Sequence, residues 1–203
     1  KKIPHILETH AEQRVDNYYW MRDDNRQDPE ILTHLEAEND YLKAVMAPHE
    51  ALKNQLFEEM KGRIVKDDSS VPVKDGKYWY MSEVAGENEY AFHYRADNAE
   101  MQNKQLLLDV NELAAPYEYY DIGDMAVSQN DELMAYSEDT DGRRIYKVKF
   151  INLANGEYLS DELENTEGQV VWANDNRTVF YVKKDLQTLL GFQVFRHVLG
   201  TPQ

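Results

Sequence analysis

The sequence contains no cysteine among its 203 residues. This absence excludes disulfide bonds, thiolate zinc sites and a cysteine nucleophile. The chain also has no apolar run long enough to cross a bilayer. Its first ten residues, KKIPHILETH, have neither the apolar stretch nor the small-residue cleavage site of a signal peptide. These absences together predict a cytoplasmic protein, because disulfides are rare in that compartment.

Basic residues are scarce, with 22 Lys and Arg against 38 Asp and Glu, which gives a net charge of −16. Residues 67–203 carry −13 of this charge and residues 1–66 only −3. The negative electrostatic field of these charges repels nucleic-acid phosphates and anionic membranes, so we expect neither nucleic acid nor a membrane as a partner. It attracts cationic ligands, although charged faces usually serve only solubility.

The first part of the chain has helical periodicity from residue 28 onward. Asp28 followed by Pro29 is a helix-start signal, because the carboxylate caps the first turn and proline there has no N–H to lose. Pro48 interrupts the pattern and Gly62 is placed to end it. We therefore predict two amphipathic helices over residues 29–61, each with an apolar stripe that needs a partner. The stripes are Ile31, Leu35, Leu42 and Met46, then Leu52, Leu56 and Met60.

A polar linker over residues 65–72 separates this region from one with a period of two. Polar and apolar residues alternate over residues 77–84 and 90–95, and a short apolar run follows at 105–110. Such segments, separated by turn residues, predict the strands of a meander.

Two later stretches repeat one pattern. Each opens with Asn-Asp, at Asn130 and at Asn174, and continues with a strand, a polar hairpin and a second strand. A further strand precedes each of them. A four-strand unit every ~40–50 residues is typical of β-propeller blades, whereas a β-sandwich need not show an internal repeat. The acidic segment ELENTEG, residues 162–168, is expected to be a solvated loop between two blades.

The repeat count predicts an incomplete propeller. Blades are expected at about residues 75–115 and 120–163, and a third begins near residue 168 without its last strand. A propeller needs at least about four blades to close, so the edge strands are open to a neighbour. The predicted fold class is α+β: an N-terminal two-helix arm over residues 1–66, then antiparallel β-meander blades of a partial β-propeller over residues 67–203. We expect a piece of a larger protein that self-associates when isolated.

Several segments carry a resemblance to a known family. They are, in order, DNYYWMRDD, ILTHLEAENDYL, SQNDELMAYSEDTDG, VVWANDN and FQVFRHVLGTP. Over the whole chain the sequence resembles the N-terminal part of the prolyl oligopeptidase family of serine peptidases, and most closely its oligopeptidase B branch. The paired tyrosines before Trp20 and the Met-Arg-Asp-Asp after it favour that branch.

The resemblance implies a seven-bladed propeller that caps an α/β-hydrolase domain and limits access to short peptides cleaved after Arg or Lys. It also implies that residues 1–66 pack on the hydrolase domain. The adjacent aromatics Tyr18, Tyr19 and Trp20 are then an anchor for that contact, although the core of a small helical unit would also explain them. The implied partners are the hydrolase domain of the same protein and short basic peptides.

No catalytic residue can be assigned within the chain. The family's serine lies in a G-x-S-x-G turn, and none of the nine glycines has a serine two residues later. The family's serine, histidine and aspartate all follow the propeller, so the 203-residue chain alone is predicted to be inactive.

No metal or cofactor site is predicted either. Asp139-Thr140-Asp141-Gly142 resembles the start of a calcium loop but lacks the remaining ligand positions, so a hairpin turn is favoured. Asp23–Asp24 and Asp67–Asp68 are adjacent acids, which do not converge on one substrate atom as a glycosidase pair does. The histidines show no ligand spacing and are interpreted as structural or surface residues; they are His5, His10, His34, His49, His93 and His197.

One alternative remains open at this stage, a non-enzymatic β-repeat module that binds a partner through its edges or its acidic face. Both hypotheses explain the strands. Only the peptidase hypothesis explains the collinear motifs and the unfinished third repeat.

Overall fold

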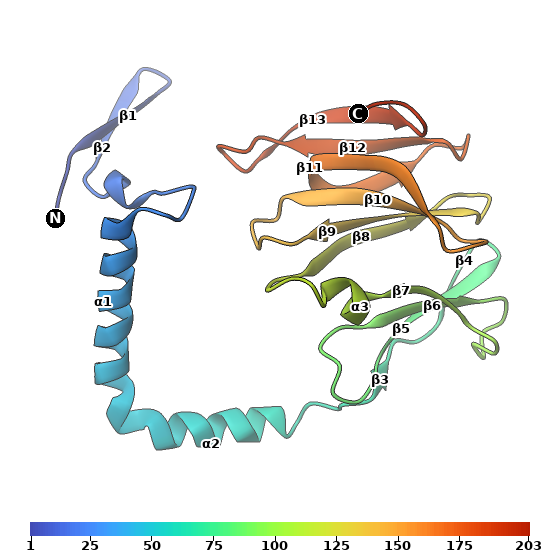
Figure 1. Cartoon of the computed structure of the whole chain (residues 1–203), viewed down its shortest axis with the longest axis horizontal. Coiled ribbons are helices and arrows are strands. Elements are labelled where there is room, and N and C mark those ends of the chain that lie inside the picture. The colour runs from blue at the N-terminus through green and yellow to red at the C-terminus, as the bar shows by residue number, and fades with distance from the viewer. The chain divides into compact units, whose positions relative to one another are not determined.

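The computed structural model describes residues 1–203 and divides into two compact units, residues 1–64 and 65–203. The sequence placed the boundary two residues later. None of the helices is both long and apolar enough to cross a membrane. The two units are described separately (Figure 1).

The first unit begins with a hairpin that the sequence did not predict. Strands β1 (His5–Thr9) and β2 (Glu12–Asp16) pair antiparallel around a two-residue turn. Both turn residues have positive φ, 55° at His10 and 62° at Ala11. Such turns usually contain Asn or Gly, so His10 and Ala11 carry no turn signal.

Helices make up the rest of this unit. Asp28 caps α1 by accepting a hydrogen bond from the backbone N–H of Glu30, and Pro29 is the first helical residue. Gly62 follows the last helical turn. Ile31 is the one buried residue of the unit, so these helices have almost no core of their own. The elements are η1 (Tyr19–Met21), α1 (Pro29–Met46), η2 (Ala47–His49) and α2 (Glu50–Lys61).

The second unit contains two antiparallel sheets (Figure 1). The first sheet has five strands, in which β3 and β4 both pair with β5, followed by β6 and β7. The second sheet has six strands in sequence order from β8 to β13. The bounds are β3 (Asp68–Ser69), β4 (Val73–Asp75), β5 (Tyr78–Val84), β6 (Phe92–Ala96), β7 (Gln105–Asp109), α3 (Val110–Ala114), β8 (Asp121–Val127), β9 (Leu133–Asp139), β10 (Tyr146–Asn152), β11 (Tyr158–Trp172), β12 (Thr178–Lys184) and β13 (Gly191–Val198).

Strand β11 corrects one sequence expectation. The segment 162–168 is not a loop but the middle of this 15-residue strand, which pairs with β10 in its first half and with β12 in its second. Its acids occupy exposed alternate positions, whereas Leu163 and Thr166 are fully buried. Gly168, with φ of +100°, lies at the register shift where the strand changes partner. The predicted second and third blades are therefore one hydrogen-bonded sheet.

Two cores hold the second unit together, one on each face of the middle strands. Met134 and Tyr136 of β9 pack with Leu108, which comes from β7. Ala135 of β9 points the other way and packs with Phe150. This alternation follows from the period of two along a strand. Strands β9 and β10 therefore each contribute to both cores.

The repeated Asn-Asp pairs form turns, and hydrogen bonds link the turn of one repeat to the turn of the next. Gln129 donates from its side chain to Asn174 Oδ1 at 2.8 Å, and the backbone N–H of Asn130 donates to Asn176 Oδ1 at 2.9 Å. From the preceding sheet, Arg95 of β6 donates to the carbonyl of Asp131 at 2.8 Å. The repeat seen in the sequence thus marks a chain of polar contacts between repeats.

Substituting Asn176 tests this chain of contacts. Asn176 has φ of +55°, a conformation that glycine adopts freely and alanine does not. Asn176→Gly removes the hydrogen bond from Asn130 and a long one to the carbonyl of Asn174 at 3.4 Å, and should lower the unfolding free energy by about 1 kcal/mol. Asn176→Ala adds backbone strain and should cost about 1–2 kcal/mol more. Urea denaturation measures both; equal values for the two variants would contradict the strained turn.

Candidate functional site: uncovered surfaces of the two units

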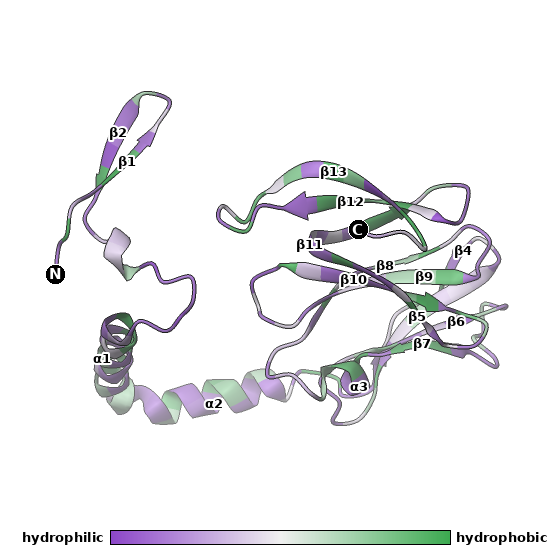
Figure 2. Ribbon diagram, turned by 45° about the horizontal axis from the view of Figure 1, so that its top comes forward, coloured by the Kyte–Doolittle hydropathy of each residue, from purple (hydrophilic) through white to green (hydrophobic).

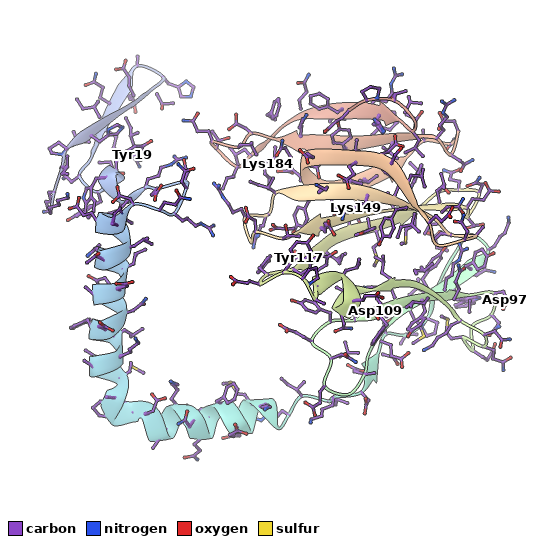
Figure 3. The ribbon with its side chains drawn as sticks, viewed as in Figure 1. Tyr19, Asp97, Asp109, Tyr117, Lys149 and Lys184 are labelled. Carbon is purple, nitrogen blue, oxygen red and sulfur yellow. The ribbon has the colours of Figure 1, made fainter.

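The aromatic segment of the first unit is only partly covered by its own unit. Tyr18 is 52% exposed, and Tyr19 and Trp20 are half-buried. The Trp20 indole donates to the carbonyl of Lys1 at 3.1 Å, and the Lys1 ammonium lies 4.8 Å from the ring centre. Tyr19 stacks on His5 at 3.9 Å (Figure 3). The unit orders these rings but leaves much of their surface to solvent.

The charged residues around the aromatics are held by short-range contacts. Arg22 pairs with Asp24 at 3.2 Å. Asp23 accepts backbone hydrogen bonds from Asp28, Gln27 and Asn25, which hold the pKa of its carboxyl below the usual range. Asp23 and Asp24 therefore fix the loop ahead of α1 and do not converge on a common target.

Apolar side chains line α1 and α2 without cover in their unit. Figure 2 shows green patches alternating with purple along α2. Burying such side chains from water is worth about 1.5–3 kcal/mol each, so the surface favours a partner. The exposed members are Leu32, Leu35, Leu42, Val45, Met46, Leu52, Leu56, Phe57 and Met60.

The second unit has an uncovered apolar face of its own. Val171, Phe180 and Val194 lie on the three successive strands β11, β12 and β13 and are 64%, 40% and 68% exposed. Val171 pairs with Phe180 across the strands, and Val182 with Val194. We call Val171, Phe180 and Val194 the open face. The opposite side of the same strands is core, where Val179 and Tyr181 are buried.

A groove of about 720 Å³ runs along the first strands of the repeats. Its wall includes Val73 of β4, Met125 of β8 and Trp172 of β11. The Trp172 indole donates to the carbonyl of Ala126 at 2.9 Å, which ties β11 to β8. His93 also lines the groove, and burial lowers its pKa. Ser82 and Asp75 line the groove as well, but burial is the one influence on the His93 pKa, so neither partners the imidazole as acyl transfer would require.

The remaining sequence candidates take separate structural positions. Asp139 is fully buried and accepts backbone hydrogen bonds from Asp141, Gly142 and Arg144, so its carboxylate shapes the loop. His197 is buried against Asp161, with 2.8 Å between Nε2 and Oδ1. No group of three or more His, Cys, Asp or Glu residues is arranged to hold a metal ion. His10 is in the hairpin turn, His34 lies on α1 6.0 Å from the Trp20 ring, His49 precedes α2, and Asp67 and Asp68 begin the second unit.

Comparisons with known proteins cover the full chain. The family model described as prolyl oligopeptidase, N-terminal beta-propeller domain, matches residues 1–203. Dipeptidyl aminopeptidase BI of Pseudoxanthomonas mexicana is 44% identical over 217 residues, which cover 99% of this chain and 30% of the relative. Protease 2 of Moraxella lacunata is 32% identical, with 99% and 30% covered.

The fold is similar to that of solved oligopeptidase B structures. The structure of oligopeptidase B from Leishmania major superposes with a TM-score of 0.86 at 29% identity, over 98% of this chain and 30% of that one. The chain thus spans about 30% of the length of the relatives it matches.

Proposed function

Because the chain belongs to the prolyl oligopeptidase family, we propose that it is the N-terminal part of a serine peptidase that cleaves short peptides after Arg or Lys. The observation that carries the proposal is the match to the family's N-terminal propeller model over all 203 residues, on a chain with no G-x-S-x-G turn. The serine, histidine and aspartate belong, in this proposal, to an α/β-hydrolase domain on the same protein.

The uncovered surfaces fit this assignment. Each large aromatic side chain can bury about 150–250 Å², worth several kcal/mol before entropy losses. Tyr18, Trp20 and the apolar sides of α1 and α2 would dock on the hydrolase domain. The open face would be covered by a further blade, just as β9 and β10 are covered on both sides. The propeller's role would be to limit access to small, flexible peptides.

Labelling with a fluorophosphonate tests the proposal. This reagent modifies an activated serine. We expect the full-length protein to be labelled and the 203-residue chain to remain unlabelled. Lack of labelling of a folded full-length protein would favour the non-enzymatic binding module, and labelling of the short chain would contradict the placement of the serine.

A second candidate function is removal of dipeptides from free N-termini, which the name of the 44% identical relative favours. An enzyme of that kind must recognise the substrate's terminal ammonium, whereas an endopeptidase need not. The full-length protein can be assayed with Ala-Arg-aminomethylcoumarin and with its N-acetylated form. Comparable kcat/KM values support the endopeptidase, and loss of more than about 100-fold on acetylation, about 2.7 kcal/mol, supports the dipeptidyl peptidase.

A further inference from the structure

A second groove in residues 65–203 lies where β7 and α3 face β9 and β10. Its volume is about 530 Å³. Leu106, Leu108 and Ile151 supply apolar walls, and acidic and tyrosine side chains supply the polar ones. Figure 3 labels three of the residues around it, Asp109, Tyr117 and Lys149. The groove is formed entirely within the second unit.

The single cation of the groove is already neutralised. Lys149 lies 2.6 Å from Glu138 Oε1, and the Tyr120 hydroxyl donates to Glu138 Oε2 at 2.6 Å. Glu138 is only 5% exposed. This buried pair therefore contributes little net charge to the groove, and both carboxylate oxygens are occupied.

Two further carboxylates leave the groove negative. Asp109 uses Oδ1 to accept the backbone N–H groups of Asn111 and Glu112, which leaves Oδ2 for a ligand. Glu112 is exposed, and its carboxylate has no ion-pair or hydrogen-bond partner. An anionic ligand would be repelled here, and a cation would be attracted.

Two tyrosines offer ring surface beside these acids. Tyr117 stacks on Tyr120, with 5.7 Å between ring centres, and is 45% exposed. Tyr158 packs edge-on against Tyr136 at 6.3 Å and is 52% exposed. Tyr117 and Tyr158 are thus each held by a neighbouring tyrosine ring, and both line the groove.

We propose that this groove binds an arginine side chain of a peptide. An apolar wall suits the methylene stem of arginine. The planar guanidinium stacks on tyrosine and forms hydrogen bonds to two acceptors at once, which a lysine ammonium does less well. The assignment rests on the proposed function and deepens it, because it adds a binding site for basic peptides to a peptidase that cleaves after basic residues.

Saturation-transfer NMR on the 203-residue chain measures peptide binding to the second groove without hydrolysis. The probes are acetyl-Gly-Arg-Gly-amide and the same peptide with citrulline, which has the shape of arginine but no charge. We expect the arginine peptide to bind at least fivefold more tightly. Equal affinity of the two peptides, or no transfer to either, would overturn the proposal.

Matched variants locate the binding. Glu112→Gln and Tyr158→Leu should each weaken the arginine peptide at least threefold, since one removes a charge and the other a ring. Glu118→Gln removes an exposed charge that does not line the groove and should leave the affinity unchanged. An unchanged affinity in both groove variants, or equal loss in the Glu118 variant, rejects the site. The result is independent of whether the full-length protein hydrolyses peptides.

Discussion

Replacing Phe180 and Val194 of the open face by serine should weaken the self-association of the 203-residue chain and should destabilise the full-length protein. In the short chain these side chains are 40% and 68% exposed. Apolar surface of this kind on adjacent strands drives association between copies. Because both side chains are partly exposed in the short chain, their replacement by serine should cost less stability there than in the full-length protein.

In the full-length protein, where a further blade is proposed to cover the open face, the same substitutions should lower the stability strongly. There Phe180 would be a core residue, as Phe150 is in the existing core. Truncating a buried phenylalanine costs about 3–5 kcal/mol, and a buried hydroxyl adds to the loss. A much larger loss of stability in the full-length protein than in the 203-residue chain would indicate that another part of the same protein covers the open face. Similar losses in both would indicate that the open face binds a separate partner.

Sedimentation velocity at high concentration measures the association, and urea denaturation measures the stability. Val71→Ser is the control, because Val71 is 80% exposed in the segment that precedes β4 and lies outside the open face. A wild-type chain that sediments only as a monomer would contradict the first expectation. An unaltered unfolding free energy in the full-length double variant would contradict the second.

The strands could be predicted from the sequence wherever side chains alternate between two environments. In β10, Val148 and Phe150 pack into a core, whereas Lys147 and Lys149 form ion pairs with glutamates, and this period of two is visible in the letters. The family was also predictable, because its motifs extend over the whole chain, and the match to residues 1–203 confirms it.

Other features left no local signal. The hairpin of β1 and β2 turns at His10 and Ala11, which are not turn formers. The segment 162–168 has the composition of a loop. Its buried side chains, Leu163 and Thr166, are three residues apart, so the letters show no period of two, and their burial depends on neighbouring strands.

The second groove could not be predicted, because its residues are distant in sequence. Tyr117 and Tyr158 are brought to one groove only when β7 and α3 pack against β9 and β10. The pairing of Lys149 with Glu138 across β10 and β9 likewise depends on the fold. The period of the side chains predicts individual strands. A site formed between strands can be predicted only when the pairing of those strands is known.

Two tyrosines are buried in the core that contains Met134 and Leu108, which we call the first core. They predict a steep loss of stability at alkaline pH. Tyr120 and Tyr136 are 4% and 1% exposed. Burial raises the pKa of each far above its ordinary value, with a further contribution from Glu138 at Tyr120 and from Tyr158 at Tyr136. The folded protein therefore keeps both protons at a pH where the unfolded chain has released them.

The sign follows from proton binding. Unfolded tyrosines lose their protons near pH 10, so above that pH the folded state binds more protons than the unfolded state, and stability falls as pH rises. The stability contribution of each tyrosine is complete below pH about 10 and decreases by about 1.4 kcal/mol per pH unit above it. For the two tyrosines the slope is about 2.7 kcal/mol per unit.

Denaturant titrations between pH 9 and 11.5 measure this slope, and Tyr136→Phe should reduce it by about 1.4 kcal/mol per unit. The Tyr136 hydroxyl has one distant partner, Tyr158 at 3.4 Å, so the variant should lose little stability at neutral pH. Tyr41→Phe, which alters a 70% exposed ring of α1, is the control and should leave the slope unchanged. A wild-type slope near zero would mean that the first core opens to water, and with it the wall that places Tyr120 and Glu138 beside the second groove.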